Sequence, residues 1–374
     1  MDTLAPGALE WVRKNMPRTR REVESLPDLS PLRLACSIHL DAKMLPFLFG
    51  IAERGADLFV TTCNPRTVRE PVVSSLRDRG IRVVATKGMS TEDLENALRG
   101  AMEWGPTHFC EMGADLSGAW KALEESGSGA PRIFAGLEAT GTGINRLGNM
   151  DLPYPVFNWD DLPVKEGLHN RFMVGLSTWA AFFNRTGLSL HEKRVVVLGF
   201  GSVGRGVADA ARAFGGAVTV VEPDPARQTE AAYRGWSVAP LGEALRRGDV
   251  VVTATGRPKV LSARELEELP DGAILLNVGH ADDEIDRRGM SPVDEPIPYL
   301  SRYRLGTKEL FLFADGAMAN LTAGEGDSIN AFDVTLAVLT RAVGFLTRFP
   351  EAEVDYPPGL HALPEEIWRP ALKM

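Results

Sequence analysis

The sequence contains little cysteine: Cys36, Cys63 and Cys110 are its only three cysteines in 374 residues. Three scattered cysteines cannot build the disulfide framework of a small secreted protein, so we expect a reducing, cytoplasmic compartment. The N-terminal segment lacks the apolar core that a signal peptide needs. No stretch approaches the roughly 18 apolar residues of a membrane span, so we expect no association with a membrane.

The sequence also lacks an excess of positive charge. It has 41 Lys and Arg against 50 Asp and Glu, a formal net charge of -9. Nucleic acids and acidic membrane surfaces would be repelled by such a chain, so neither is expected as a partner. The hydrophobic content of 44% and the charged content of 24% are typical of globular proteins. The length favours two domains.

Short apolar runs rich in β-branched residues alternate with segments of helical periodicity. In the first half the run Leu32–Leu40 leads into a helical segment that ends near Gly55, a residue suited to a helix C-terminus. A second series begins at Arg194–Gly201. Strands that alternate with helices indicate parallel α/β architecture. We therefore predict an α/β fold with two doubly wound domains, one binding substrate and one of the Rossmann type.

The predicted domain boundaries follow from the two strand series. Residues 1–170 are expected to form the substrate-binding domain and residues 171–325 the Rossmann domain. Residues 326–374 are expected to supply a long apolar helix, Ser328–Leu346, that returns to the first domain, and a short tail. The segment Val164–Arg185 is predicted to be the connecting helix.

A glycine-rich turn directly follows the apolar strand Val195–Leu198. In a Rossmann unit, Gly199 would allow the tight turn, Gly201 the close approach of the pyrophosphate, and Gly204 the packing of helix on strand. Ser202 and Val203 would open the helix whose N-terminus binds the phosphates. The next strand ends at Glu222, where a carboxylate accepts hydrogen bonds from the ribose and repels a 2′-phosphate. The pattern therefore predicts NAD as the cofactor.

Two later strand ends are expected to border the same crevice, because ligands lie beyond the carboxyl ends of parallel strands. The first is Thr253–Gly256, from which Thr255 is a candidate cofactor contact. The second is Asn277–His280, from which Val278, Gly279 and His280 are candidates.

Several ordered motifs resemble those of the adenosylhomocysteinase family. The resemblance is carried by Asn277–Asp286 (the family's NIGHxxxEID), Thr61–Asn64 (SSCN), Ala85–Gly88 (AWKG), Asn158–Lys165 with His169 and Asn170 (NDSxTKxxxDN), and Asn320–Gly326 (NLAAAEG). His39 falls in the place of the histidine of the family's HMT motif. The matches run from about Leu32 to about Thr335.

The resemblance implies a transient use of NAD. Members of the family oxidise the 3′-hydroxyl of an adenosine derivative to a ketone, which acidifies the neighbouring C4′–H. Loss of that proton expels the 5′ substituent, water adds at C5′, and the ketone is reduced again. The protein then contributes positioning and proton transfer.

The resemblance also implies roles for individual residues. Lys165 matches the lysine that helps to deprotonate the 3′-hydroxyl. The implied cofactor contacts are Thr140, Thr142, Asn170, Glu222, Val278, Gly279, His280 and Asn320. The implied substrate contacts are His39, Asp41, Asn64, Glu138, Lys165 and Asp327. His39 and His280 are also candidates for catalysis, and no metal site is expected.

The chain departs from the family pattern at five positions in the implied active site. The motif's catalytic aspartate is here Met112, the aspartate beside Asn170 is His169, and a cysteine near the nicotinamide is Val174. The histidine of the GHP turn is Asp327, and the threonine of HMT is Asp41. We expect Glu111 or Glu138 to replace the missing carboxylate, with His169 as a further group that titrates near neutral pH.

Three hypotheses for function follow. The first is an NAD-dependent, dehydratase-like enzyme that acts on an adenine nucleoside by 3′-oxidation and 4′,5′-elimination. The second is a true adenosylhomocysteinase, and the third is a catalytically silent NAD-binding regulator. The family's C-terminal arm, which reaches a neighbouring subunit, has no counterpart here, so we expect a homo-oligomer no larger than the family's tetramers, namely a dimer.

Overall fold

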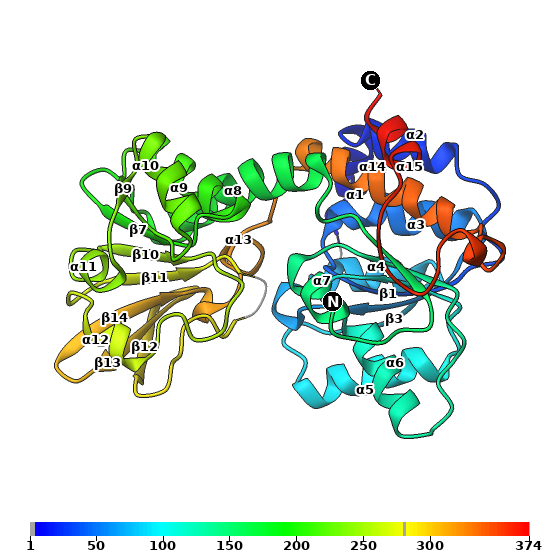
Figure 1. Ribbon diagram of the computed structural model, residues 1–374, viewed down its shortest axis with the longest axis horizontal. Coiled ribbons are helices and arrows are strands. Elements are labelled where there is room, and N and C mark those ends of the chain that lie inside the picture. The colour runs from blue at the N-terminus through cyan, green and yellow to red at the C-terminus, as the bar shows by residue number, and fades with distance from the viewer. Residues whose placement is uncertain (1–3, 280–281, 374) are drawn as a thin grey trace. The chain divides into compact units, whose positions relative to one another are not determined.

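The structure is a computed structural model that describes residues 4–279 and 282–373. The chain divides into two compact units, shown in Figure 1. The first contains Met1–Lys165 and Ile329–Met374, and the second contains Glu166–Ser328. The second unit is therefore inserted into the first, and the chain changes unit close to the boundaries expected after residues 170 and 325.

The first unit is built on a seven-stranded sheet in which every described pair of neighbouring strands is parallel. The strands are, in sheet order, β3 (Arg82–Val84), β2 (Asp57–Thr62), β1 (Arg33–Ile38), β4 (His108–Glu111), β5 (Ala135–Glu138), β6 (Pro155–Asn158) and β15 (Gly359–Ala362). The direction of the strand order reverses between β1 and β4. Ligands of doubly wound sheets bind at this point, beyond the carboxyl ends of the strands.

Helices cover both faces of this sheet, which explains why its strands read as apolar runs. Apolar side chains of α3 (Leu45–Glu53), α4 (Glu70–Asp78) and α14 (Ile329–Leu346) belong to the core on one face. Those of α5 (Thr91–Glu103), α6 (Asp115–Glu125) and α7 (Gly141–Leu147) belong to the core on the other. Helices α1 (Ala8–Lys14) and α2 (Pro17–Glu24) precede the sheet.

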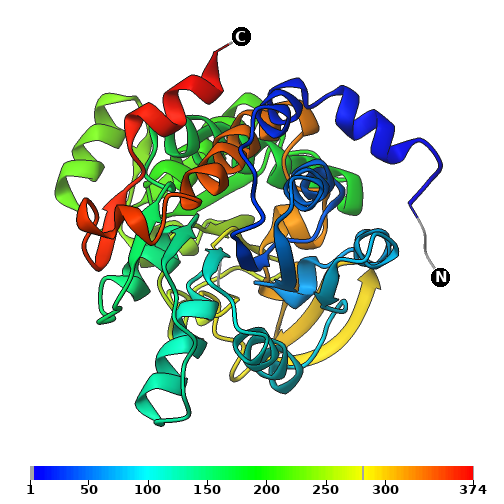
Figure 2. The same cartoon turned by 90° about the vertical axis from the view of Figure 1, so that its right-hand side faces the viewer.

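The C-terminal segment completes the first unit. Strand β15 extends the sheet beside β6, and α15 (Glu365–Trp368) follows it. The last residues lie close to α2, as Figures 1 and 2 both show. Arg21 of α2 links the N-terminal and C-terminal segments, because its guanidinium donates to the carbonyl oxygens of Ala371 (3.1 Å) and Lys373 (2.6 Å).

Helix α14 requires a correction of one expectation. Its 18 residues have a mean hydropathy of 1.5, so by length and composition it is long enough and apolar enough to cross a membrane. The statement that no segment approaches this length was therefore wrong. In the structure 61% of this segment is buried, because α14 packs on the sheet and on α2. An apolar core helix passes the same compositional test as a membrane span.

The second unit contains an eight-stranded sheet in the described part of the chain. The strands are, in sheet order, β9 (Ser237–Val238), β8 (Ala217–Val221), β7 (Arg194–Leu198), β10 (Val250–Thr253), β11 (Ile274–Asn277), β14 (Lys308–Phe313), β13 (Leu300–Leu305) and β12 (Ser291–Ile297). From β9 to β14 the neighbouring strands are parallel and follow the Rossmann order, with the reversal between β7 and β10. The predicted fold class is confirmed.

Helices also cover both faces of the second sheet. The core on one face includes residues of α8 (Val174–Thr186), α9 (Ser202–Ala213) and α10 (Pro225–Tyr233). The core on the other includes residues of α11 (Leu241–Leu245) and α12 (Ala263–Glu267). The expected connecting helix is observed as a π-helical segment, η3 (Lys165–Met173), that continues into α8. Such widened turns often occur at functional sites.

The sequence analysis did not predict the antiparallel strands of the second sheet. Strand β12 pairs with β13, and β13 pairs with β14, all in antiparallel fashion. Most of β12 is exposed, and it contains Pro292 and Pro296. Proline is tolerated on edge strands because the outer backbone groups have no neighbour to bond. An exposed edge strand with two prolines gives no apolar run to detect.

Candidate functional site

The glycine-rich turn between β7 and α9 has the geometry of a dinucleotide loop. Gly199 has a φ of 94°, and a Cβ added there would lie 2.6 Å from the carbonyl oxygen of Ala254. A Cβ added at Gly204 would lie 2.0 Å from the carbonyl oxygen of Gly199. At Gly201 the nearest atom would be Nη1 of Arg227, 4.0 Å away. Gly199 and Gly204 are thus required by close contacts within the protein, whereas a side chain at Gly201 would point into open space beside the turn.

The N-terminus of α9 is suited to bind a pyrophosphate. No side chain caps this end of the helix in the described structure, so the backbone N–H groups of its first turn remain available for an anion. The Ser202 hydroxyl donates to Oε1 of Glu166 at 2.5 Å. Val203 is partly buried against the core of the second unit. A hydroxyl and unpaired N–H groups beside an open glycine fit a dinucleotide phosphate.

Glu222 lies at the end of β8, as predicted, and is 6% exposed. Its Oε2 accepts from the backbone N–H of Phe200 at 2.6 Å, and its Oε1 accepts from that of Asp224 at 3.0 Å. The carboxylate therefore also holds the glycine-rich turn against β8. Each oxygen retains a second lone pair for a ribose hydroxyl.

We expect Glu222→Ala to weaken NAD binding by about 1.5–3 kcal/mol, or roughly 10–100-fold in Kd, because charge-assisted hydrogen bonds are lost. The same change should narrow the preference for NAD over NADP, since the negative charge that repels a 2′-phosphate is removed. Calorimetry with both dinucleotides checks this, with Asp224→Ala as the control. An equal loss of affinity for both dinucleotides would mean that Glu222 only supports the turn.

A buried carboxylate joins the two later strand ends. Glu284 is 1% exposed and accepts from the backbone N–H of Thr255 (3.1 Å), from its hydroxyl (2.7 Å) and from the N–H of Gly256 (2.9 Å). Burial raises the pKa of Glu284 above its usual value. A Cβ at Gly279 would lie 1.9 Å from Oε1 of Glu284, and Gly279 N donates to Oδ1 of Asn277 at 2.7 Å. Thr255 and Gly279 are therefore held at one edge of the sheet.

The neighbouring predicted contacts are only partly described. Val278 is buried, and its N–H donates to the carbonyl oxygen of Thr253 at 3.0 Å. His280 lies outside the described residues, so its predicted role stays a prediction.

Asn320 begins the segment that leaves the cofactor domain, and it is 3% exposed. Its Nδ2 donates to Oγ of Ser177 at 3.3 Å, while its Oδ1 is buried without a hydrogen-bond partner among the described residues. A buried acceptor of this kind needs a donor to offset the cost of its burial, and a bound cofactor can supply one. This observation fits the predicted contact between Asn320 and NAD.

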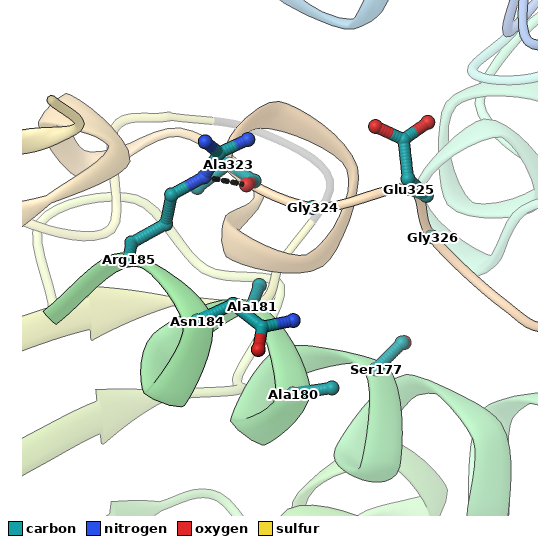
Figure 3. A pocket seen from close by; sticks show the side chains of 9 residues that line it. All are labelled: Ser177, Ala180, Ala181, Asn184, Arg185, Ala323, Gly324, Glu325 and Gly326. Carbon is teal, nitrogen blue, oxygen red and sulfur yellow. Dashed lines mark hydrogen bonds between the residues drawn. The ribbon is translucent and has the colours of Figure 1, made fainter. Parts of the chain in front are cut away.

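A cavity of about 360 Å³ adjoins this segment, and Figure 3 shows its walls. One wall is α8, with Ser177, Asn184 and Arg185, and the other is the chain from Ala323 to Gly326. The Arg185 Nε donates to the carbonyl oxygen of Ala323 at 2.7 Å and so joins the walls. Ser177 lines this cavity and also accepts the hydrogen bond from Nδ2 of Asn320.

In the first unit, most of the predicted substrate residues lie at the carboxyl edge of the sheet. His39 follows β1, and its Nδ1 lies 2.9 Å from Oγ1 of Thr67. Asn64 follows β2, and its Oδ1 accepts from Arg66 N at 3.0 Å. Asp41 is 8% exposed and pairs with Lys43, with Oδ2 and Nζ 3.2 Å apart. The negative charge that replaces the family's threonine is thus balanced by a buried lysine.

Glu111 and Glu138 end the adjacent strands β4 and β5 and are both buried. Glu111 accepts from the N–H groups of Leu116 (2.8 Å) and Ser117 (3.2 Å) and from the Ser117 hydroxyl. The two oxygens of Glu138 accept from backbone N–H groups of Gly113, Ala114, Ala139 and Thr140.

These contacts show how the protein holds both carboxylates, and their expected role in place of the missing carboxylate stays a prediction. Glu111 binds N–H groups in the first turn of α6, where helix N–H groups attract negative charge, whereas Glu138 binds N–H groups of the residues just before α6 and α7. Burial is the main cause that raises the pKa of Glu111 to about 8 and that of Glu138 to about 7, and the neighbouring carboxylate raises the pKa of Glu111 further.

We expect Glu111→Gln to flatten the pH dependence of stability. The folded protein keeps a proton on this carboxyl up to about pH 8, whereas the unfolded chain loses it near 4.5. The free energy of unfolding therefore falls as the pH rises through this range. A glutamine can accept from the same N–H groups and donate to the Ser117 hydroxyl without carrying a charge. At pH 8 we expect Glu111→Gln to have a higher Tm than the wild type. Each kcal/mol of added unfolding free energy corresponds to about 2–4 °C in Tm.

Calorimetric scans between pH 5 and pH 8 check this prediction, with the exposed Glu125→Gln as the control. Burial lowers the pKa of His108 to about 4, so His108 contributes the opposite trend below its usual value of 6.5. That contribution is common to both proteins and cancels in their difference. Parallel pH profiles for the wild type and Glu111→Gln would contradict the prediction.

Lys165 is 9% exposed, and its Nζ donates to Oδ1 of Asp160 at 2.9 Å. Asp160 follows β6, where its backbone N–H donates to Oδ1 of Asn158 at 2.9 Å. The predicted cofactor residues Thr140 and Thr142 lie at the N-terminus of α7, and Thr140 caps that helix by accepting from Gly143 N at 2.9 Å. Their predicted contact with the cofactor remains a prediction.

The remaining predicted residues belong to the second unit. His169 and Asn170 lie in η3, where the chain packs closely on α9: a Cβ at Gly206 would lie 2.1 Å from the carbonyl oxygen of Arg171. Asp327 lies in the loop after α13 (Ala319–Thr322), and its Oδ2 is 2.5 Å from Nδ1 of His169.

The sequence prediction missed three residues that support the site. Glu284 was included in a quoted motif without a role, Asp160 was not identified as the partner of Lys165, and Lys43 was not identified as the partner of Asp41. A signal for two of them was present, since Asp160 and Lys43 stand in tight turns a few residues from their partners.

Comparison with known proteins agrees with this geometry. The family profile described as "S-adenosyl-L-homocysteine hydrolase, NAD binding domain" matches residues 177–326. The chain is 31% identical to the S-inosyl-L-homocysteine hydrolase of Methanopyrus kandleri, over 98% of this chain and 89% of that protein. It is 32% identical to the adenosylhomocysteinase of Thermococcus kodakarensis over the same shares. The cofactor of the second unit is NAD, and the chain belongs to the adenosylhomocysteinase family.

Proposed function

We propose that this protein catalyses an NAD-dependent elimination on a purine nucleoside. The reaction consists of transient oxidation at C3′, removal of the C4′ proton and departure of the 5′ substituent. The observation that carries the proposal is the buried Lys165, whose ammonium is held by Asp160 at 2.9 Å in a chain of this family. The retained glycine-rich turn and Glu222 support it.

The residues of this chain account for the first step. When bound, NAD supplies an acceptor for the electrons of the C3′–H bond and later returns them, so the net reaction is redox-neutral. Lys165 passes one ammonium proton to the carboxylate of Asp160, to which its Nζ donates, and the neutral amine then takes the proton of the 3′-hydroxyl. Burial of both side chains excludes water from the pair. General base catalysis requires such a group within hydrogen-bond reach of the proton that it removes.

The fate of the intermediate distinguishes two reactions. Met112 is 8% exposed, and its thioether cannot exchange a proton, while Glu111 and Glu138 are committed to backbone N–H groups. We therefore propose that elimination is not followed by addition of water. The C4′–H and C5′–X bonds break, a C4′=C5′ double bond forms, and the proton leaves with X. When X is hydroxide, the enzyme is a dehydratase.

A second candidate is hydrolysis of the thioether substrates named for its relatives. Those relatives include both adenosylhomocysteinases and S-inosyl-L-homocysteine hydrolases at comparable identity. The base can therefore be adenine, as predicted from the sequence, or hypoxanthine. A third possibility from the sequence, a silent NAD-binding regulator, is an outcome of the test below.

The test is product analysis in deuterium oxide with adenosine, inosine, S-adenosylhomocysteine and S-inosylhomocysteine. We expect a 4′,5′-unsaturated nucleoside, and deuterium at C4′ of recovered substrate. Release of homocysteine with formation of the free nucleoside would favour the second candidate. Bound NAD without conversion of any of the four compounds would overturn both and favour the regulator.

A further inference from the structure

Glu166 of η3 places a carboxylate beside the cofactor loop of the second unit. The Ser202 hydroxyl donates to Oε1 of Glu166 at 2.5 Å, and Ser202 is the first residue of α9. Glu166 is exposed, and no lysine or arginine pairs with it in the described part of the chain. The carboxylate therefore lies not beside a cation but at the end of a helix whose free N–H groups attract anions.

The segment η3 lies along one face of α9. A Cβ at Gly206 would lie 2.1 Å from the carbonyl oxygen of Arg171, and the Arg171 side chain pairs with Asp209. Ser202, Gly206 and Asp209 follow one another at helical spacing, so they share one face of α9. Arg171 thus fixes the C-terminal half of η3 on this face, and the contact of Glu166 with Ser202 holds the N-terminal half at the first turn of α9.

The pyrophosphate of NAD requires the same end of α9. N–H groups in the first turn of such a helix bind the phosphates, and Ser202 opens that turn. The carboxylate of Glu166 is one hydrogen bond away from Ser202, so it carries negative charge to the place where the pyrophosphate brings its own. Because like charges in contact repel, Glu166 and the pyrophosphate compete for this end of the helix.

We propose that Glu166 is an anionic latch, which binds Ser202 at the N-terminus of α9 in the ligand-free protein and is displaced by the pyrophosphate of NAD. Displacement frees the Ser202 hydroxyl to donate to a phosphate oxygen. It also releases the N-terminal half of η3, the segment that carries Asn170, a predicted NAD contact. The conformation of η3 thereby depends on whether the cofactor site is filled. The latch requires NAD binding at α9 but not the proposed elimination.

Glu166→Gln tests the latch, because glutamine keeps the shape of the side chain and an acceptor for Ser202 but carries no charge. We expect this variant to bind NAD about three- to tenfold more tightly than the wild type at low salt. Screening should reduce the difference as the ionic strength rises from about 0.05 to about 0.5 M. Calorimetric titration with NAD gives the affinities. Glu267→Gln is the control, because it removes the same charge from an exposed position on α12, which covers the other face of the sheet.

A second measurement compares unfolding without and with NAD. If NAD displaces Glu166, then Glu166→Gln and the wild type differ in stability only while ligand-free. The unfolding equilibrium of the ligand-free variant should shift toward the unfolded state by the same factor by which NAD binding tightens, and saturation with NAD should make both proteins equally stable. NAD binding no tighter than that of Glu267→Gln would overturn the latch, because Glu166 then keeps its place in the complex. Tighter binding without the matching loss of ligand-free stability would also overturn it, because the charge then acts from a distance and not through the contact with Ser202.

Discussion

Replacing Lys165 with methionine is expected to abolish the reduction of bound NAD by substrate while NAD remains bound. Lys165 is the group proposed to take the proton of the 3′-hydroxyl, and loss of such a group costs about 10²–10⁴-fold in rate. Methionine keeps the apolar stem at a position that is 9% exposed. The measurement is the absorbance change of the cofactor on rapid mixing with a convertible nucleoside, with NAD content measured by mass analysis.

A loss of NAD reduction in Lys165→Met must be distinguished from a loss of folding stability. Lys165→Met leaves the carboxylate of Asp160 without its ammonium partner at a position 8% exposed, and removal of one partner of a buried pair costs about 3–5 kcal/mol. The double variant Lys165→Met with Asp160→Asn removes that charge, so it should regain stability and remain inactive. Lys14→Met, an exposed lysine of α1, is the control. Reduction at the wild-type rate in the double variant would show that another group removes the proton.

The parts of the fold that could be predicted from the sequence are those in which local chemistry determines the structure. The turn at Gly199 and Gly204 is required by close backbone approaches, and the strands beside it are apolar because helices cover both faces. Fold class, family and cofactor were accordingly confirmed. Strand β12 was missed because an exposed antiparallel edge strand carries no apolar pattern.

Within the site, the sequence indicated which residues stand at strand ends but not where their side chains point. Glu111 and Glu138 follow the pattern of substrate-facing carboxylates; in the structure Glu111 accepts from the first turn of α6, and Glu138 accepts from the residues just before α6 and α7. That direction depends on where those helices begin, which is a property of packing. The contact between His169 and Asp327 joins residues distant in the sequence, so each was interpreted alone.

The second large effect is expected at the glycine-rich turn, where two single substitutions should have different consequences. Gly204→Ala places a Cβ 2.0 Å from the carbonyl oxygen of Gly199, so α9 must shift away from the turn. Overpacking of this kind costs about 1–3 kcal/mol or more, and the helix N-terminus moves with it. We expect lower stability without ligand and at least about a hundredfold weaker NAD binding.

Gly201→Ala should weaken NAD binding without lowering the stability of the ligand-free protein. Its added Cβ would meet no atom closer than 4.0 Å, so the stability without ligand should stay within about 0.5 kcal/mol of the wild type. The same methyl group would occupy the space through which the backbone approaches the pyrophosphate, so NAD binding should still weaken by about tenfold or more. Calorimetric unfolding and NAD titration give the two quantities, and Gly242→Ala on α11 is the control. Normal NAD affinity in Gly201→Ala would mean that the pyrophosphate does not lie over the N-terminus of α9.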